Sequence, residues 1–326
     1  MSSIPYSRYI VYPVPWYSFL IVLGATLAVF LGSREERRAA LPKDTVIDLA
    51  VRVLPIGIIG ARIYYVVFAW NQFRDHPLSI LKIWEGGIAI YGGLIAGIAV
   101  IIVFCRKRHL SVLQLCDLIA PGLALAQCIG RWGNYFNIEA YGLTLHNPDL
   151  CFFPLAVEVP LSGGSEWHMA TFFYESFWDF LDFLFLIFTR RSWLRKRGDV
   201  FFVYLFLYAS GRLMIEDLRT DSLYASSVRV SQLLSVLLCI SVMVYYLIRS
   251  QSHRTKPRPL FFLLTSPIFL FSLAVLYNCV SGGLIPADVP AVRLLFLFLY
   301  VLTAVVTLLI LYHHIRQEAC HADDTI

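Results

Sequence analysis

The chain has 326 residues, of which 58% are hydrophobic and only 15% are charged, and its mean hydropathy is +0.68. Soluble domains carry about 25% charged residues, so this chain has too few polar side chains to cover an exterior that faces water. The composition therefore excludes a disordered chain, a soluble globular enzyme and a coiled coil. The formal net charge of +5 is modest for a nucleic-acid-binding protein, and we expect no nucleic-acid partner.

Apolar runs that are long enough to cross a lipid bilayer recur along the whole chain. A helix needs about 20 residues to span the hydrocarbon core. Because only helices and closed barrels satisfy the backbone in lipid, such runs predict an all-α integral membrane protein, a polytopic helical bundle. Nine runs of suitable length cover residues 14–32, 45–69, 86–104, 111–129, 171–189, 198–217, 229–248, 260–278 and 291–312.

Basic residues lie mostly on one side of these spans. Seventeen of the 27 Lys and Arg residues fall in connections after odd-numbered spans, seven fall in the opposite connections and three fall within spans. The positive-inside rule then places the N-terminus outside and the C-terminus in the cytoplasm. The longest polar connection, residues 130–170, faces outward. Its prolines, glycines and β-prone pieces such as CFFPLAVEV predict a small extracytoplasmic cap.

The N-terminus and the cysteines indicate neither processing nor metal binding. No basic stretch followed by a cleavage site is evident, so we expect the first span to remain in the mature protein. The seven cysteines form no CxxC pair, which argues against a disulfide framework or a metal site. A possible boundary lies at RSQSHRTKPRP, residues 249–259. We therefore expect a membrane core over residues 1–250 and a C-terminal extension with two further spans over residues 251–326.

The sixth span carries polar residues that share one helical face. Tyr208, Arg212 and Glu216 are spaced by four residues, and Arg219 follows three residues later. An ionisable side chain costs about 2.5–3.5 kcal/mol at a helix centre on insertion scales, so it needs a compensating environment. The face is either an internal ion pair of Arg212 with Glu216 that ties helices together, or part of a functional site.

Other polar residues are predicted at the same outer level, which favours a functional site because a structural ion pair does not require them. The residues predicted at this level are Tyr17, Arg62, Tyr64, Tyr65, Glu85, Tyr91 and Arg131.

In the fifth span, Glu175, Asp179 and Asp182 share a face that runs inward from the outer surface. Glu175 is near that surface, and Asp182 is about 10 Å deeper by helical rise. Arg62 or Arg212 are possible partners, and protonated or snorkelling carboxyls are the alternative.

The segment GRWGNYFNIEAYG, residues 130–142, has the composition of an anion-binding loop. Its glycines permit close approach and non-helical turns, and Arg131 can hold phosphate oxygens through two parallel bonds. Asn134 and Asn137 supply amide donors, and Glu139 supplies a carboxylate just beyond a span. Ordinary turn residues and a solvated charge are the alternative. The glycines of GGIAIYGGLIAG, residues 86–97, predict tight helix packing, although they could also leave room for a lipid chain.

These stretches resemble the prolipoprotein diacylglyceryl transferase family. The resemblance covers about residues 14–248 and includes, besides GRWGNYFNIEAYG, the elements PWYSF, GARIYYVVFAW, GGIAIYGGLIAG, FFYESFWDF and GDVFFVYLFLYASGRLMIEDLRTDSL. Family members are seven-span membrane proteins that act at the outer leaflet without a metal. They transfer the diacylglyceryl group of phosphatidylglycerol to the lipobox cysteine thiol of a prolipoprotein and release glycerol phosphate, the first step of bacterial lipoprotein maturation.

The resemblance implies the partners, the location and the roles of individual residues. Phosphatidylglycerol and a prolipoprotein signal peptide with a lipobox cysteine would be the partners, in the bacterial cell membrane and without a cofactor. Arg131 and Arg212 would hold the lipid phosphate. Further family positions linked to activity are Tyr17, Asn134, Glu139, Gly142, Tyr208 and Glu216.

The sequence departs from the family pattern in three places. Tyr91 stands where many members have a histidine, so a histidine base is absent there. The element HMATFFYE has Met169 in place of a proline. Residues 255–326 exceed the seven-span core, and the resemblance implies nothing about them.

Attack of a thiol on a glycerol carbon requires cations for the departing phosphate and a group that accepts the thiol proton. We expect the catalytic residues to be Arg212, Glu139, Glu216, Tyr17, Tyr91 and Tyr208, and the substrate-binding residues to be Arg131, Asn134, Asn137, Gly142 and Arg219, with no metal ligand. Two other classes stay open. A transporter or flippase for an anionic amphiphile would explain buried arginines, although no inverted repeat is found. A membrane scaffold would not explain the glycine-rich segment.

Overall fold

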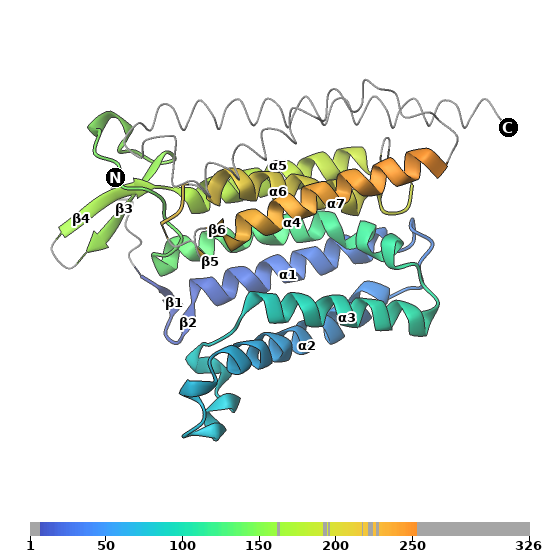
Figure 1. The fold of residues 1–326 in the computed structure, drawn as a ribbon, viewed down its shortest axis with the longest axis horizontal. Helices are drawn as coiled ribbons and strands as arrows, with labels where there is room; N and C mark the ends of the chain where they lie inside the picture. Colours follow the sequence, from blue (N-terminus) through green and yellow to red (C-terminus); the bar gives the residue numbers. More distant parts are fainter. Residues whose placement is uncertain are drawn as a thin grey trace. The chain divides into compact units, whose positions relative to one another are not determined.

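A computed structural model describes residues 7–161, 164–191, 194, 196–216, 218–220, 224–225 and 228–252. The predicted spans over residues 260–278 and 291–312 lie outside the described residues. Within those ranges the chain is mostly helical (Figure 1). The α-helices are α1 (Trp16–Glu35), α2 (Thr45–Phe68), α3 (Ile90–Arg108), α4 (Val112–Asn137), α5 (Thr171–Thr189), α6 (Asp199–Glu216) and α7 (Val230–Ser252). The strands are β1 (Tyr9–Val11), β2 (Val14–Pro15), β3 (Ala156–Leu161), β4 (Gly164–Met169), β5 (Tyr224–Ala225) and β6 (Val228–Arg229).

Each of the first seven predicted spans overlaps one of these helices, although α4 continues eight residues beyond its predicted end at residue 129. Three of them, α1, α3 and α4, are long and apolar enough to cross a membrane by length and composition. Their ends follow local chemistry. Helix α3, for example, has basic residues in its last turn, where they complement the helix dipole, and ends at His109 in the left-handed conformation. The prediction of a helical membrane protein is confirmed.

One compact unit comprises residues 26–122, in which α2 and α3 lie side by side (Figure 1). The approach is close enough to require glycine. A Cβ added at Gly92 would lie 2.4 Å from Gly60 O and 2.4 Å from Tyr64 Cβ. The packing interpretation of the glycine-rich segment is therefore confirmed at Gly92. The core of this unit is formed by residues such as Leu49, Phe104 and Leu115, all of which are buried.

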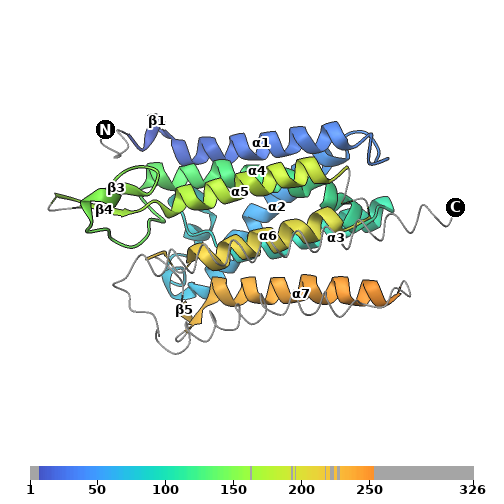
Figure 2. The same ribbon diagram turned by 90° about the horizontal axis from the view of Figure 1, so that it is seen from above.

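The other compact unit comprises the described residues before residue 26 and after residue 122. Within it, α6 lies beside α5 and α7 (Figures 1 and 2). Phe206, Leu213 and Val236 form part of the apolar core between α6 and α7. On the other side of α6, the Trp178 side chain of α5 covers Gly211 and donates a 2.9 Å hydrogen bond from Nε1 to Leu207 O. These contacts fix the rotation of α6.

An antiparallel hairpin precedes α5. Strand β3 pairs with β4 from Ala156↔Met169 to Leu161↔Gly164, so the β-prone piece identified in the sequence does contain a strand. The buried face of the hairpin includes Val157 and Val159, which pack on Phe172 at the start of α5. The hairpin thereby orders the chain at the N-terminal end of α5.

Candidate functional site

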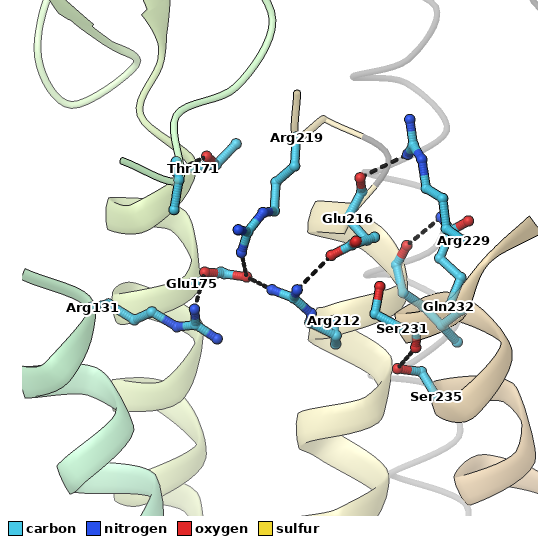
Figure 3. A network of polar contacts seen from close by, with 12 residues as sticks. Arg131, Thr171, Glu175, Arg212, Glu216, Arg219, Arg229, Ser231, Gln232 and Ser235 are labelled. Carbon is cyan, nitrogen blue, oxygen red and sulfur yellow. Dashed lines mark hydrogen bonds and ion pairs between the residues drawn. The ribbon is translucent and has the colours of Figure 1, made fainter. Parts of the chain in front are cut away.

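Three arginines converge on one buried carboxylate, that of Glu175 on α5 (Figure 3). Arg131 Nη1 lies 2.8 Å from Oε2, Arg219 Nη1 lies 3.4 Å from Oε1, and Arg212 Nη1 also contacts Oε1. Only 4% of the Glu175 side chain is exposed. We refer to Arg131, Glu175, Arg212, Glu216 and Arg219 as the Glu175 cluster.

Arg212 connects the two carboxylates of this cluster. Its Nη1 contacts Glu175, and its Nη2 lies 2.7 Å from Glu216 Oε2, one helical turn further along α6. The ion pair predicted from the i, i+4 spacing is therefore confirmed. Arg212 was also one of two predicted partners for the acidic face of α5, and this prediction is confirmed at Glu175. The guanidinium is held from two sides, which fixes its plane.

Arg131 reaches the cluster from a helix. Helix α4 continues to Asn137, so the interpretation of residues 130–137 as a loop is wrong. The glycines in this stretch serve helix packing instead. A Cβ on Gly133 would lie 2.6 Å from Tyr17 Cδ2, and one on Gly130 would lie 3.3 Å from Ile21 Cδ1 of α1. Close contact with α1 stabilises the added helical turns and directs Arg131 toward α5.

The polar residues that follow Arg131 form a second group at the end of α4. Asn137 Nδ2 donates a 3.2 Å hydrogen bond to Glu139 Oε1, and Arg8 Nε donates one of 3.2 Å to Asn137 Oδ1. The backbone oxygen of Asn134 accepts a 3.0 Å bond from Glu139 N. The Tyr17 ring packs against α4 at Gly133, between Arg131 and Asn137 in the sequence.

Gly142 positions Arg219 through the backbone. The two residues form an antiparallel β-bridge, and the neighbouring Leu143 N donates a 3.0 Å bond to Leu218 O. On its other side, Gly142 N donates a 2.8 Å bond to Met169 O at the end of β4. His168 Nδ1 lies 2.9 Å from Gly142 O. The segment around Gly142 thus joins the hairpin to the chain after α6.

Two tyrosines of α6 lie next to the cluster. Tyr208 is one turn before Arg212 and interacts electrostatically with Arg131 and Arg212. Tyr204 stacks on Tyr208 with ring centroids 6.2 Å apart, and its hydroxyl donates a 2.9 Å bond to Gln127 of α4. The sequence-predicted position of Tyr208 on the same helical face as Arg212 is consistent with these interactions.

Asp179 and Asp182 continue the acidic face of α5 beyond Glu175. Both are buried, and within the described part of the chain Oδ2 of each has no hydrogen-bond partner. A buried carboxyl oxygen without a hydrogen-bond partner costs free energy whichever protonation state the group adopts. The structure therefore shows no stabilising contact for Asp182 Oδ2.

We expect Asp182→Ala to raise the free energy of unfolding by about 1–3 kcal/mol, because a buried polar group is removed from within an apolar helix. Unfolding of the detergent-solubilised protein measures this change. Asp48→Ala is the control, since Asp48 is 38% exposed and pairs with Arg108, and it should lower stability slightly or leave it unchanged. A loss of stability in Asp182→Ala would show that this carboxyl has a partner.

Arg62, the other predicted partner of the acidic face, binds elsewhere. It is buried and donates hydrogen bonds of 2.7–3.4 Å to backbone oxygens in the connection between α2 and α3. That part of the prediction is wrong, because the carbonyls of this turning segment satisfy the guanidinium. The backbone oxygens bound by Arg62 are those of Ser79, Ile80, Lys82, Gly86 and Gly87.

Tyr91 is the second residue of α3 and belongs to the unit of residues 26–122.

The Glu175 cluster is suited to binding an anion and unsuited to binding a metal. Its cations outnumber its carboxylates, and Arg212 already presents two donor nitrogens to separate acceptors. Among the residues that the structure describes, no group of three His, Cys, Asp or Glu side chains could hold a metal ion. Fold and site together define a helical membrane protein in which partly exposed arginines surround a buried carboxylate.

Comparison with known proteins identifies the family. Residues 6–248 match the family model described as prolipoprotein diacylglyceryl transferase, and the chain belongs to this family. It is 42% identical over 255 residues to the phosphatidylglycerol–prolipoprotein diacylglyceryl transferase of Limosilactobacillus reuteri (strain DSM 20016), covering 76% of this chain and 90% of that protein. It is also 42% identical over 243 residues to the protein of the same name from Streptococcus agalactiae serotype Ia, covering 74% and 94%. The Lactobacillus delbrueckii subsp. bulgaricus protein (strain ATCC BAA-365 / Lb-18) is 42% identical over 260 residues, covering 77% and 90%.

Proposed function

We propose that this protein is an enzyme that transfers the diacylglyceryl group of phosphatidylglycerol to the lipobox cysteine thiol of prolipoproteins. The reaction forms a thioether, releases glycerol phosphate and is the first step of bacterial lipoprotein maturation. Family membership and the names of relatives at 42% identity support this proposal. The observation that carries it is the convergence of Arg131 and Arg212, from two different helices, on one carboxylate.

Arg131 and Arg212 suit the phosphate of the lipid. Phosphatidylglycerol carries one negative charge at this group, and the leaving group becomes more negative as the carbon–oxygen bond breaks. Guanidinium groups fixed in advance stabilise that developing charge without reorganising during the reaction. Arg219, which the backbone at Gly142 holds in place, adds a third cation on the same side of Glu175 as Arg212.

The residues around the arginines would orient the lipid and accept a proton. A free thiol has a pKa near about 8.5, so only a small part is thiolate at neutral pH. We assign proton acceptance to Glu139 or Glu216, so that the thiol proton moves to a carboxylate as the carbon–sulfur bond forms and the carbon–oxygen bond breaks. Tyr17, Tyr91 and Tyr208 would orient the lipid, while Asn134, Asn137 and Gly142 would contribute to substrate binding.

Charge distribution supports an orientation in the bacterial cell membrane. The excess of basic residues after odd-numbered spans favours an external N-terminus and a cytoplasmic C-terminus. In this orientation the start of α5 and the end of α6 lie toward the outer leaflet, with the segment 138–170 as an extracytoplasmic cap. We further propose seven spans for the core, residues 1–250, and two more for residues 251–326.

The proposed function is tested by mixing membranes that contain the protein with phosphatidylglycerol and a lipobox peptide. An enzyme yields a peptide with a thioether-linked diacylglyceryl group, detected by mass spectrometry. A Cys→Ser peptide and vesicles of phosphatidylethanolamine are the controls and should yield no product. Movement of lipid between leaflets without any peptide product would instead indicate a transporter. If neither peptide product nor lipid movement is observed, the protein would be a scaffold.

We expect a variant that lacks residues 255–326 to retain most of the transfer activity. The family match ends at residue 248, and the residues proposed for the site all lie before it. The same assay measures the effect at equal amounts of membrane-inserted protein, determined by immunoblot. Complete loss of transfer in a correctly inserted variant would show that the extension belongs to the catalytic unit.

A further inference from the structure

Both oxygens of Glu175 face guanidinium groups. Oε2 faces Arg131 on α4, and Oε1 faces Arg212 and Arg219 on the other side (Figure 3). The carboxylate is 4% exposed, so these arginines replace water as its surroundings. Glu175 is therefore the group that joins α4, α5 and α6 electrostatically.

A carboxylate and a phosphate present similar acceptors to arginine. Each offers two oxygens on one centre, and both match the paired donors of a guanidinium. The donors of Arg131 and Arg212 that would hold a lipid phosphate are directed at Glu175 in this structure. Glu175 thus occupies an acceptor position that the phosphate would need.

The contacts of Glu175 differ in quality. Arg131 Nη1 lies 2.8 Å from Oε2, yet Oε2 has no aligned hydrogen-bond partner among the described residues. Charge attracts the two groups, but the directional part of a strong guanidinium–carboxylate bond is missing on this side. Of the two arginines proposed to hold the phosphate, Arg131 is therefore the one whose contact with Glu175 an incoming anion could replace with less loss.

Arg212 would keep its position if Glu175 moved away. Its Nη2 lies 2.7 Å from Glu216 Oε2, in an i, i+4 ion pair within α6 that does not depend on Glu175; this contact, too, is one of charge rather than of an aligned hydrogen bond. The guanidinium therefore stays oriented while Nη1 exchanges one acceptor for another. Glu216 thus orients Arg212 through Nη2, whereas Glu175 occupies Nη1, the donor that the phosphate would take.

We propose that Glu175 is an internal counter-ion that the lipid phosphate displaces from Arg131 and Arg212 during binding. The inference rests on the proposed function, since it specifies how the same site receives its anionic substrate. Before binding, Glu175 neutralises and orients the arginines in a medium where unpaired charges are costly. After the reaction, the same carboxylate competes with glycerol phosphate and promotes its release. Glu175 is on this view a positioning residue.

The test compares Glu175→Gln with the wild type as full-length protein in nanodiscs. Glutamine keeps the size of the side chain and removes the competing charge, so we expect glycerol 1-phosphate to bind about tenfold more tightly or more. Phosphatidylglycerol nanodiscs provide a second arm, in which KM for the lipid should fall together with kcat because product release slows. Calorimetry with glycerol 1-phosphate and the transfer assay give these values.

Glu166→Gln is the matched control, because it removes one carboxylate of the same unit outside the Glu175 cluster and is 53% exposed. It should bind glycerol 1-phosphate as the wild type does. Should Glu175→Gln fail to fold, Glu175→Asp keeps the charge but withdraws it by one methylene group, and an intermediate gain in affinity is expected.

Equal or weaker binding by either Glu175 variant overturns the proposal, because a purely structural carboxylate would lose affinity when removed. Absence of glycerol 1-phosphate binding in both wild type and variant overturns it as well. Failure of the proposed function is a separate result. In that case the wild type yields no lipidated peptide, while the effect of Glu175→Gln on anion binding remains measurable.

Discussion

Arg212→Lys should reduce diacylglyceryl transfer by about 10²–10³-fold, the range seen when one preorganised donor to a developing negative charge is lost. Arg212 uses two nitrogens at once, one toward Glu175 and one toward Glu216. A lysine ammonium is a point charge on a flexible stem and cannot contact both acceptors in one plane. Initial rates with a lipobox peptide and phosphatidylglycerol measure the loss.

Arg131→Lys should lose activity to a similar extent, because Arg131 is the cation that approaches the site from α4. The control for both is Arg108→Lys. Arg108 also pairs with a carboxylate, Asp48, but it belongs to the unit of residues 26–122 and its side chain is 35% exposed. Its replacement should leave the rate within a few-fold of wild type. Near-normal transfer by Arg131→Lys or Arg212→Lys would refute the phosphate-binding role.

Helical periodicity was sufficient to predict the contacts within a single helix. The spacing of Arg212 and Glu216 gave an ion pair that the structure contains, and the spacing along α5 placed Glu175, Asp179 and Asp182 on one buried face. These relations depend only on 3.6 residues per turn and on the cost of ionisable groups in lipid.

The sequence alone does not show which carboxylate the arginines contact, because this depends on the tertiary structure. Which arginines meet Glu175 depends on how α4, α5 and α6 are rotated about their axes, and packing between neighbouring side chains decides this. Trp178 against Gly211 fixes α5 and α6. The sequence predicts Glu139 and Glu216, not Glu175, as the carboxylates of the site, although the place of Glu175 at the outer end of the acidic face is a usable signal.

The sequence predicts too early an end for α4, at residue 129 instead of Asn137, for a related reason. Glycines and asparagines in residues 130–137 favour turns when taken locally, but the aromatic residues between them pack on neighbouring helices. Trp132 contacts Phe172 with ring centroids 5.8 Å apart, and Phe136 stacks on Trp16 at 4.8 Å. This packing outweighs the turn preference and keeps the segment helical, as tertiary contacts commonly do.

Gly142→Ala is expected to reduce transfer by about 10²-fold, an effect typical of a displacement near 1 Å at a site that must be preorganised. A Cβ at this position would lie 2.8 Å from Leu218 O, Met169 Cβ and Thr171 Cγ2. Leu218 O is a backbone atom, Met169 Cβ belongs to the last residue of β4, and Thr171 Cγ2 belongs to the first residue of α5. Since none is the tip of a flexible side chain, relief requires the backbone itself to move.

The movement would be transmitted to Arg219, because Gly142 and Arg219 are joined in a β-bridge. Arg219 would then withdraw from Glu175, whereas the Arg131 contact, which comes from α4, would persist. We therefore expect the loss to appear mainly in kcat, together with a decrease of about 1–3 kcal/mol in the free energy of unfolding from overpacking. Steady-state kinetics and unfolding in detergent measure the two effects.

Gly97→Ala is the control for the added methyl group. Its Cβ would lie 3.8 Å from Val53 Cγ1, an ordinary van der Waals contact between α3 and α2. Alanine also favours the helix over glycine by about 1 kcal/mol. This variant should keep its activity and its stability. Wild-type kinetics in Gly142→Ala would mean that the chain after α6 can shift without cost, and that Arg219 is not held by the backbone at Gly142.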